Sequence, residues 1–203
     1  MITQLEIKLK YQSEEKLNYN ISSVMHGILM GHIDRAYGER MHEDGLKPFV
    51  QEVCNIKEDE FIWRICTMTE EAKIQIIEPL MKMDQFYMKH RELRLKVCER
   101  NLKEISYDTL IENYYFEEQP RNITIKFCSP TAFKSQGNYI FMPTVRLIFQ
   151  SLIHKYDTFS SDLWKKLWIL PGLLHFSLVR TPGYQLLPVH PPDRPPADHP
   201  YLQ

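Results

Sequence analysis

The stretch LEIKLK, Leu5–Lys10, sets the pattern from which the fold can be predicted. Its apolar side chains alternate with charged ones, the apolar set being Leu5, Ile7 and Leu9. Successive residues of a β-strand point to opposite faces, so alternation with a period of two is typical of a strand that buries one face. The stretch therefore predicts a half-buried strand with an apolar core on one side.

The segments that follow supply partners for this strand. Apolar residues at helical spacing predict two helices, and runs of β-branched and aromatic residues predict three more strands. In chain order we expect a helix over about 22–40, strands over 49–53 and 60–69, a helix over about 70–83 that buries Ile74, Ile77 and Met81, and a strand through Leu93, Leu95 and Val97. The order βαββαβ predicts an α+β, ferredoxin-like (RRM-like) domain over residues 1–118, in which two helices cover one face of a four-stranded sheet.

A second unit begins near residue 119 and repeats the opening of the first. Ile123, Ile125 and Phe127 alternate like a strand, and SPTAFKSQGN, residues 129–138, is typical of a loop. Thr144 is a suitable N-cap for a following helix. The buried stripe predicted for that helix consists of Val145, Ile148, Phe149, Leu152 and Tyr156. We therefore expect a second, incomplete ferredoxin-like domain over residues 119–170.

The C-terminal segment differs in composition from the rest. Seven of the thirteen prolines lie at or after Pro182, and proline lacks the N–H that a sheet ladder requires. Residues 171–203 are therefore predicted to form an atypical proline-rich tail that is disordered.

Composition excludes several classes of protein. Lys and Arg number 25 against 26 Asp and Glu, so the net charge of −1 gives no overall field that attracts nucleic acid or membranes. Any site for a polyanion must be a local patch. The four cysteines are widely spaced, which argues against a zinc knuckle and a disulfide framework and predicts a cytoplasmic protein.

The segment MHEDGLKPF, residues 41–49, gathers proton-handling and charged groups where a helix ends. Gly45 permits a left-handed turn and Pro48 prevents further helix, so His42 should lie on an accessible loop. Imidazole exchanges protons near neutral pH, and Lys47 can stabilise charge on a phosphate, so the pair suits phosphodiester cleavage. The alternative is a solvated loop in which His42 only interacts with the helix C-terminus.

A metal site is a weaker prediction for the same loop. His42, Glu43 and Asp44 are ligand types, but neighbours in a loop rarely converge on one ion. We therefore expect no metal and no cofactor, and we rank a metal-dependent nuclease that uses Glu43 and Asp44 last.

His26 lies on the first predicted helix and shares a lateral face with Tyr37. It is either a histidine satisfied at the boundary between helix and sheet or a second functional imidazole. Gly27 and Gly31, four residues apart on this helix, suggest that a backbone or ligand approaches closely.

A local basic stripe is predicted on the last strand of the first domain. Arg94, Lys96 and Arg100 should share its exposed face, and the stripe extends into the second unit through Lys126, Lys134 and Arg146. Such a stripe can follow a phosphate backbone, with Tyr87 or Phe133 stacking on unpaired bases. The alternative is that these charged residues only protect an edge strand against aggregation, which is a common role for charges on an exposed strand.

Three stretches together resemble one known family, that of the sixth Cas protein, the CRISPR repeat-processing endoribonuclease. They are HGILMGHIDRAYGERMHEDGLKPF (26–49), SPTAFKSQGNYIFMP (129–143) and VRLIFQSLIHKYD (145–157), and the resemblance spans roughly residues 1–160. It implies a tandem pair of ferredoxin-like domains and metal-independent cleavage of the repeat RNA in a CRISPR precursor transcript. The implied partners are this RNA, and further CRISPR effector subunits or a second copy of the chain.

The resemblance places the family's active-site histidine on His42 and its lysine nearest Lys47. In some members a tyrosine of the first helix completes the site. Met30 stands at the matching turn here, so that role is vacant or falls to Tyr37 or His26. The implied mechanism is attack by the RNA's own 2'-hydroxyl on the adjacent phosphate, which leaves a 2',3'-cyclic phosphate and a 5'-hydroxyl end.

The sequence departs from the family's pattern after about Asp162. The family's C-terminal domain normally ends with a glycine-rich loop that cradles RNA, whereas no glycine follows Gly183 here. This departure predicts a frameshifted or truncated gene and leaves activity open. The alternative to a nuclease is an RNA-binding subunit that holds the repeat hairpin without cutting it.

Overall fold

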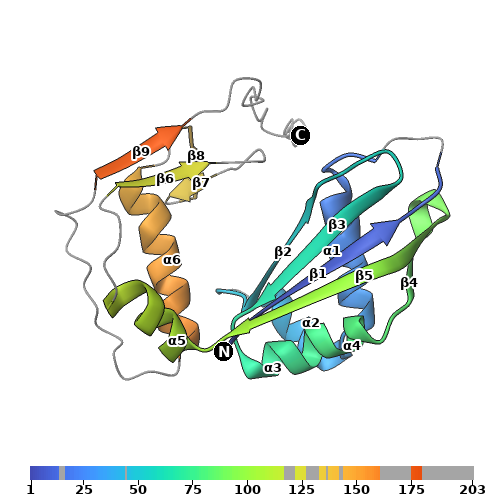
Figure 1. The fold of residues 1–203 in the computed structure, drawn as a ribbon, viewed down its shortest axis with the longest axis horizontal. Helices are drawn as coiled ribbons and strands as arrows, with labels where there is room; N and C mark the ends of the chain where they lie inside the picture. The colour runs from blue at the N-terminus through green and yellow to red at the C-terminus, as the bar shows by residue number, and fades with distance from the viewer. Residues whose placement is uncertain are drawn as a thin grey trace, which may run out of the picture. The chain divides into compact units, whose positions relative to one another are not determined.

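The computed structural model describes residues 1–13, 17–43, 45–116, 122–126, 133–135, 137–141, 144–160 and 175–179. The chain divides into two compact units, residues 1–119 with 146–170 and residues 120–145 with 171–203. Figure 1 labels the elements of both units. The expected domains 1–118, 119–170 and 171–203 stay predictions.

Strand β1 (Ile2–Lys10) is the central strand of the first unit. Its neighbours are β3 (Glu60–Thr67) and β5 (Leu93–Ile105), both antiparallel to it. Outside them, β2 (Phe49–Cys54) pairs with β3 and β4 (Gln85–Met88) pairs with β5, which gives the order β2-β3-β1-β5-β4 (Figure 1). The predicted first strand is therefore confirmed, and it joins the two halves of the sheet.

This arrangement confirms the α+β, ferredoxin-like prediction for the first unit. The four predicted strands stand in the order β2-β3-β1-β5, with every neighbouring pair antiparallel. Strand β4, which was absent from the expected set, adds a fifth strand at the β5 edge. The 3₁₀ turn Lys89–Arg91 joins β4 to β5 and makes the two a hairpin.

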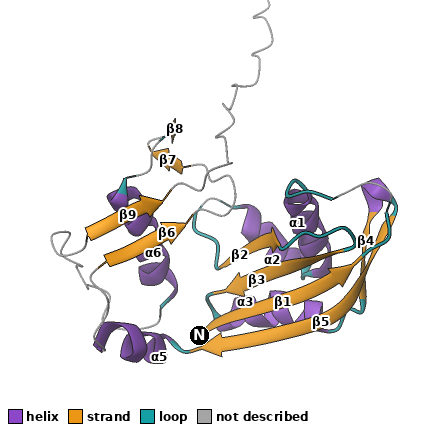
Figure 2. Ribbon diagram, turned by 45° about the horizontal axis from the view of Figure 1, so that its top comes forward, coloured by secondary structure: helices purple, strands orange, loops and turns teal. Residues whose placement is uncertain are grey.

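Helices cover one face of this sheet, as Figure 2 shows for α1 (Ile21–His32), α2 (Arg35–His42) and α3 (Glu70–Ala72). The side chains between the helices and the sheet form the core, and the bulkiest fully buried ones are Trp63, Tyr37, Phe61, Phe86, Leu5 and Ile7. The opposite face carries the alternate residues of each strand, which are mainly polar. We call this second face the open face.

The helix predicted over 22–40 is interrupted, so that part of the prediction is wrong. Ile33 is extended, with φ −96° and ψ 162°, and it ends α1. Asp34 then begins α2, because its Oδ1 accepts the Tyr37 N–H at 3.0 Å. A short polar side chain that caps a new helix competes with continuation of the old one.

The second predicted helix consists of α3, the π-helical turn Lys73–Ile77 and α4 (Glu78–Met81). The wider π-helical turn rotates the residues that follow it relative to those before it. As a result Ile74 and Met81 are exposed, although they were expected on the buried stripe. The side chains that are buried instead, together with the expected Ile77, are Ala72, Ile76 and Leu80.

Strand β5 is longer than predicted and contains a β-bulge. Its register with β1 shifts at the step Lys8–Leu9. An extra residue in one strand makes the side chains beyond it exchange faces. Arg100 therefore lies opposite Ile7 on the helix-covered face, whereas Arg94 and Lys96 lie on the open face.

The first unit continues with α5 (Tyr107–Ile111), the π-helical turn Glu112–Phe116 and α6 (Val145–Phe159). The Tyr107 hydroxyl donates to the Met68 carbonyl at 2.8 Å, and its ring meets the edge of a tyrosine of α6 at 5.5 Å between centroids. These contacts attach α5 and α6 to the end of β3.

Helix α6 starts directly after Thr144, as predicted. Its apolar stripe is less covered than expected, because none of its residues is fully buried. Val145 and Leu152, both expected in the core, are exposed.

The second unit contains two strand pairs. Strand β6 (Asn122–Lys126) is parallel to β9 (His175–Val179), and β7 (Phe133–Ser135) is antiparallel to β8 (Asn138–Ile140). The strand predicted through Ile123 is thus confirmed, and the loop predicted over 129–138 contains β7. The prediction of a disordered tail over 171–203 is wrong for β9, and the rest of that tail lies outside the described residues.

Cys54, Cys66 and Cys98 are free thiols, as their spacing predicts, and Cys128 lies outside the described residues. Among the helices of the described part, none is long and apolar enough to cross a membrane.

Glu60 holds the end of the central strand pair through two ion pairs. Its carboxylate lies 3.1 Å from Lys8 Nζ and 2.6 Å from Lys57 Nζ. These hydrogen bonds, with the Lys57 bond the stronger, lower the pKa of Glu60 below its ordinary value of 4.5. A carboxyl whose pKa is lowered by folding adds stability above its unfolded pKa, and this stability is lost as the pH falls through the folded pKa.

We expect Glu60→Gln to lower the free energy of unfolding near neutral pH. The difference from the unaltered protein should shrink as the pH falls below about 4, where both side chains become neutral. Urea unfolding followed by circular dichroism over this pH range measures the effect. A difference that does not change with pH would show that the charge of Glu60 contributes nothing.

Candidate active site

The α2–β2 loop, residues 43–48, connects the end of α2 to the start of β2. Gly45 has a φ of +115°, so the predicted positive-φ turn after the helix is confirmed. The Pro48 carbonyl accepts the Met68 N–H at 2.8 Å, which fixes the chain where it enters the sheet. Asp44 lies outside the described residues. The loop is therefore held at the sheet and bent at a defined glycine.

His42 is the last residue of α2, and its side chain is exposed. The next residue closes the helix, since the Glu43 N–H donates to the Arg40 carbonyl at 3.3 Å. An exposed imidazole at a fixed helix end can reach a substrate and exchange a proton with it.

Lys47 reaches back across the same loop. Its Nζ donates to the backbone carbonyl of Glu43, the residue that follows His42. This bond keeps the ammonium close to the backbone that carries the imidazole. The structure thus brings the predicted pair, His42 and Lys47, to one loop, where an ammonium can stabilise negative charge on a phosphate.

His26 also borders this loop. Its ring stacks on Phe49 with 6.0 Å between centroids and 7° between planes. Phe49 is the first residue of β2 and stands two positions after Lys47. The half-buried His26 therefore lies at the boundary between helix and sheet, as one reading predicts, and beside the loop, as the other requires.

Gln51 fixes α1 against β2, and it was not among the predicted site residues. Its Nε2 donates to the Ser22 carbonyl at 2.8 Å, and its Oε1 accepts the Trp63 Nε1–H at 2.7 Å. The signal in the sequence is a polar residue between Phe49 and Val53, at a position where alternation predicts a core-facing side chain. Because buried polar groups must be paired, such a residue points to a specific hydrogen-bonding role.

Tyr37, the candidate third catalytic group, is only 2% exposed. Burial raises the pKa of its hydroxyl, Glu71 raises it further, and Arg40 lowers it by a smaller amount. The Arg40 guanidinium carbon lies 5.1 Å from the centre of the ring. A buried hydroxyl cannot contact RNA in this conformation, so the prediction of a catalytic Tyr37 is corrected to a core residue that anchors α2.

Arg94 and Lys96 are exposed on the open face, as predicted. Arg94 stands opposite Tyr87 of β4, and Lys96 stands opposite both Gln85 of β4 and Lys10 of β1. Tyr87 is 47% exposed, so an accessible aromatic ring stands opposite a cation on this face. We call Lys10, Tyr87, Arg94 and Lys96 the hairpin patch.

Arg100 does not belong to the hairpin patch. Beyond the bulge its side chain is half-buried on the helix-covered face, donates to the Met83 carbonyl and lies 3.6 Å from Asp84. The prediction that Arg100 shares a face with Arg94 and Lys96 is wrong, because simple alternation fails across a bulge.

The other basic candidates are described separately, because they belong to different parts of the chain. Lys134 stands opposite Tyr139 in the β7–β8 hairpin, with its Nζ 4.6 Å from the centre of the ring. Lys126 ends β6, and the exposed Arg146 lies in the first turn of α6. Their assignment to an RNA surface stays a prediction.

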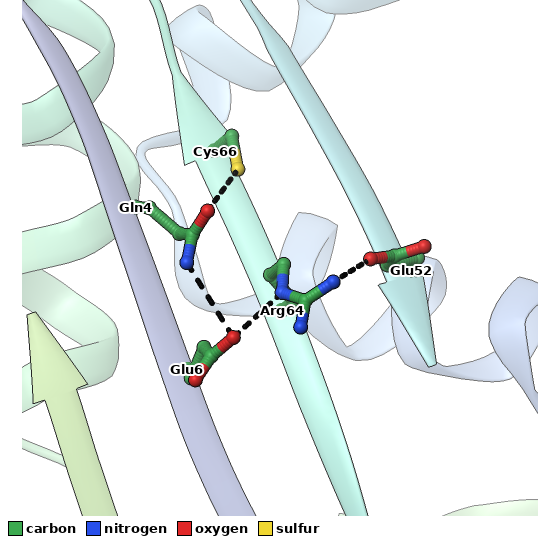
Figure 3. A network of polar contacts seen from close by, with 5 residues as sticks. All are labelled: Gln4, Glu6, Glu52, Arg64 and Cys66. Carbon is green, nitrogen blue, oxygen red and sulfur yellow. Dashed lines mark hydrogen bonds and ion pairs between the residues drawn. The ribbon is translucent and has the colours of Figure 1, made fainter. Parts of the chain in front are cut away.

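The middle of the open face carries an ion-pair network that no sequence pattern indicated (Figure 3). Arg64 of β3 donates from Nε to Glu6 of β1 at 2.7 Å and from Nη1 to Glu52 of β2. Gln4 joins it, with Nε2 3.4 Å from Glu6 and Oε1 3.8 Å from the Cys66 thiol. Burial raises the pKa of that thiol, so it stays protonated near neutral pH. The network pairs the charges at this position with one another instead of leaving them for a ligand.

A metal centre receives no support within the described ranges, where no three His, Cys, Asp or Glu side chains gather in a way that could hold an ion. The prediction that involves Asp44 lies outside those ranges.

Comparisons with known proteins point to one family. The family model described as CRISPR-associated endoribonuclease Cas6 matches residues 125–183. This match continues past Asp162, so the predicted departure from the family's pattern is wrong for the residues up to 183.

Two curated relatives are named CRISPR-associated endoribonuclease Cas6. The relative from Mycobacterium tuberculosis (strain CDC 1551 / Oshkosh) is 31% identical over 134 residues, which are 65% of this chain and 43% of the relative. The relative from Streptococcus thermophilus is 32% identical over 131 residues, which are 64% of this chain and 53% of the relative. The chain thus spans about half the length of these relatives.

Two solved structures, each a Cas6 product complex, have the same fold. Their TM-scores are 0.58 and 0.60 at sequence identities of 16% and 18%. The alignments cover 80% of this chain and 66% of each solved chain. At these identities the likeness concerns the fold alone.

Gly45→Ala tests whether the loop requires its positive φ. Nothing lies within 4 Å of the Cβ that alanine would add, so the only penalty is backbone strain. We expect the free energy of unfolding to fall by about 1–3 kcal/mol. Urea unfolding measures this, and stability equal to that of the unaltered protein would contradict it.

Gly27→Ala is the matched control. Nothing lies within 4 Å of its added Cβ either, but Gly27 is an exposed residue of α1. Alanine should therefore raise the free energy of unfolding by about 1 kcal/mol. The open space beside Gly27 and Gly31 also means that no described residue makes the close approach predicted for them.

Proposed function

This chain belongs to the Cas6 family of CRISPR-associated endoribonucleases, and we propose that it cleaves CRISPR precursor RNA within the repeats. Its family match and its relatives' names support this class of activity. The observation that carries the proposal is the exposed His42 at the end of α2, with the Lys47 ammonium bonded to the adjoining backbone.

The proposed reaction uses the RNA as its own nucleophile. The 2'-hydroxyl attacks the adjacent phosphorus, its proton leaves to a base, and the bond to the 5'-oxygen breaks as that oxygen takes up a proton. His42 supplies one of these two proton transfers, and Lys47 stabilises the charge that builds on the phosphate. The products are a 2',3'-cyclic phosphate and a 5'-hydroxyl end.

The second proton transfer needs another group, and His26 is the candidate. Its ring is half-buried on Phe49 at the β2 end of the loop, two residues after Lys47 in the chain. Tyr37 is not a candidate because its hydroxyl is buried. His42 and His26 would then act as a pair of imidazoles, one as general base and one as general acid.

The hairpin patch is the candidate surface that binds the RNA at a distance from the cleaved phosphate. The α2–β2 loop enters the sheet at Phe49, which pairs with Thr67 of β3, and Thr67 pairs in turn with Thr3 near the start of β1. The hairpin patch includes Lys10 at the other end of β1. Seven residues of a strand span about 23 Å. An RNA strand that contacts both places must therefore run along the sheet.

The alternative function is an RNA-binding subunit that holds the repeat hairpin without cutting it. The hairpin patch favours binding whether or not the loop is catalytic, because Tyr87 and its neighbouring cations offer both stacking and charge. The predicted contacts with further CRISPR effector subunits and with a second copy of the chain stay predictions.

The cleavage prediction is tested with repeat RNA in the presence of EDTA. The full chain should cut the RNA and leave a cyclic phosphate, and His42→Ala should lower the single-turnover rate by about 10²- to 10⁴-fold. End analysis of the products and quenched time courses measure both. His154→Ala, which removes an exposed histidine of α6, is the matched control and should leave the rate unchanged.

The possible outcomes separate the proposals. RNA binding without cleavage would favour the non-cleaving subunit and reject the nuclease. Activity that EDTA abolishes would favour a metal-dependent reaction that uses the Glu43 and Asp44 segment.

The hairpin patch is tested by the salt dependence of binding. Arg94→Ala and Lys96→Ala should each weaken RNA binding and reduce the slope of log K against log salt by about 1. Fluorescence anisotropy over a range of salt concentrations measures this slope. Lys82→Ala, which removes an exposed cation at the end of α4 on the helix side, should leave the slope unchanged. Equal effects of all three substitutions would show that binding depends on overall charge only.

A further inference from the structure

We infer that the ion pair between Arg40 and Glu71 positions His42, an inference that rests on the role proposed above for that histidine. Arg40 lies two residues before His42 in the last turn of α2, and Glu71 lies in α3. Arg40 Nη2 and Glu71 Oε1 are 2.5 Å apart. The pair therefore connects the end of α2 to a neighbouring element of the same unit.

Helix α2 needs external support because it is short. It has eight residues and contains Gly38, and isolated helices of this length are not stable in water. Its first turn is held by the Asp34 cap and by the buried Tyr37. Its last turn has less support, since Met41 is half-buried and His42 is exposed.

Arg40 restrains this last turn from two sides, in addition to the packing of Met41 against the core. Its guanidinium carbon lies 5.1 Å from the centre of the Tyr37 ring, and its Nη2 bonds to Glu71. The Tyr37 ring cannot move easily because it is buried in the core. Glu71 is also held, because it lies in α3, whose start is fixed by a cap. The cap is Thr69, whose Oγ1 accepts the Ala72 N–H at 3.1 Å.

The direction of His42 follows from the direction of Arg40. With 3.6 residues per turn, side chains two positions apart on a helix differ by about 200° in direction. Arg40 points towards α3, so His42 points to the opposite side of α2. When Arg40 is held by Glu71, rotation of the last turn is restrained, and the Cα–Cβ bond of His42 keeps one direction.

The neighbouring ion pair provides a matched control. Arg35 and Glu39 lie on the same helix, 3.0 Å apart, with side chains 92% and 67% exposed. This pair joins two residues of α2 and ties the helix to nothing else. If ion pairs on α2 acted only through general helix stability, the two pairs would behave alike.

The inference predicts a loss of rate that exceeds the loss of stability. Glu71→Ala should lower the single-turnover cleavage rate at saturating RNA by at least about tenfold, because small errors in the position of a catalytic group reduce rates strongly. The RNA dissociation constant should change by less than about twofold, and the melting temperature by less than about 4 °C, since exposed ion pairs contribute little to stability. Glu71→Gln, which keeps a hydrogen-bond acceptor, should retain more of the rate. Glu39→Ala should match the unaltered protein.

A second measurement does not depend on cleavage. The imidazole resonances of His42, assigned by their loss in His42→Ala, should shift in the NMR spectrum of Glu71→Ala and stay unchanged in Glu39→Ala. If the unaltered chain does not cut RNA, the proposed function fails, but these resonances still test the position of His42.

Two results would overturn the inference. Unchanged His42 resonances in Glu71→Ala would show that the ion pair does not position the ring. Tighter RNA binding by Glu71→Ala, with a steeper salt dependence, would show that Glu71 instead restrains Arg40 from contacting phosphate.

Discussion

The burial of one face of β1 is the constraint on which the rest of the first unit depends. Leu5, Ile7 and Leu9 are all 0% exposed, between β3 on one side and β5 on the other. A slip of one residue would turn all three to the open face, so the register of the sheet is strongly specified. The same apolar face requires a cover of helices, and that cover brings α2 to the end of the sheet where β2 begins.

Accessibility separates the groups that can act on a substrate from those that support them. His42 is exposed because the cap at Asp34 and the core residue Tyr37 hold the first turn of α2, which leaves its last turn at the surface. Gln51 similarly fixes α1 on the sheet, because its side-chain amide is hydrogen-bonded to both Ser22 and Trp63. The chemistry thus gathers where helices end on the sheet, while the middle of the open face is occupied by the ion pairs of Arg64.

The second unit shows that the later part of the chain still contributes a paired strand. Strand β9 pairs with β6, so residues 175–179 and 122–126 share one sheet although about fifty residues separate them in the chain. The whole of β9 and the last two residues of β6 fall within the range of the family match, residues 125–183. Composition predicted an atypical, disordered tail from residue 171 onward. Proline content describes a whole segment, so it does not reveal a short strand within that segment.

Local patterns in the sequence determined four of the five strands of the first unit, the positive φ of Gly45 and the loop that carries His42 and Lys47. Each follows from neighbouring residues, since side-chain alternation, a glycine turn and a helix-ending proline act within a few positions of the chain. Tertiary structure alone decided the break at Ile33, the face of Arg100 and the burial of Tyr37. The β-bulge and the packing of α2 against the core depend on contacts between segments that are distant in sequence, and no local pattern records such contacts. The Asp34 cap is local, but it competes with the continuing helical pattern, and the packed structure decides between the two.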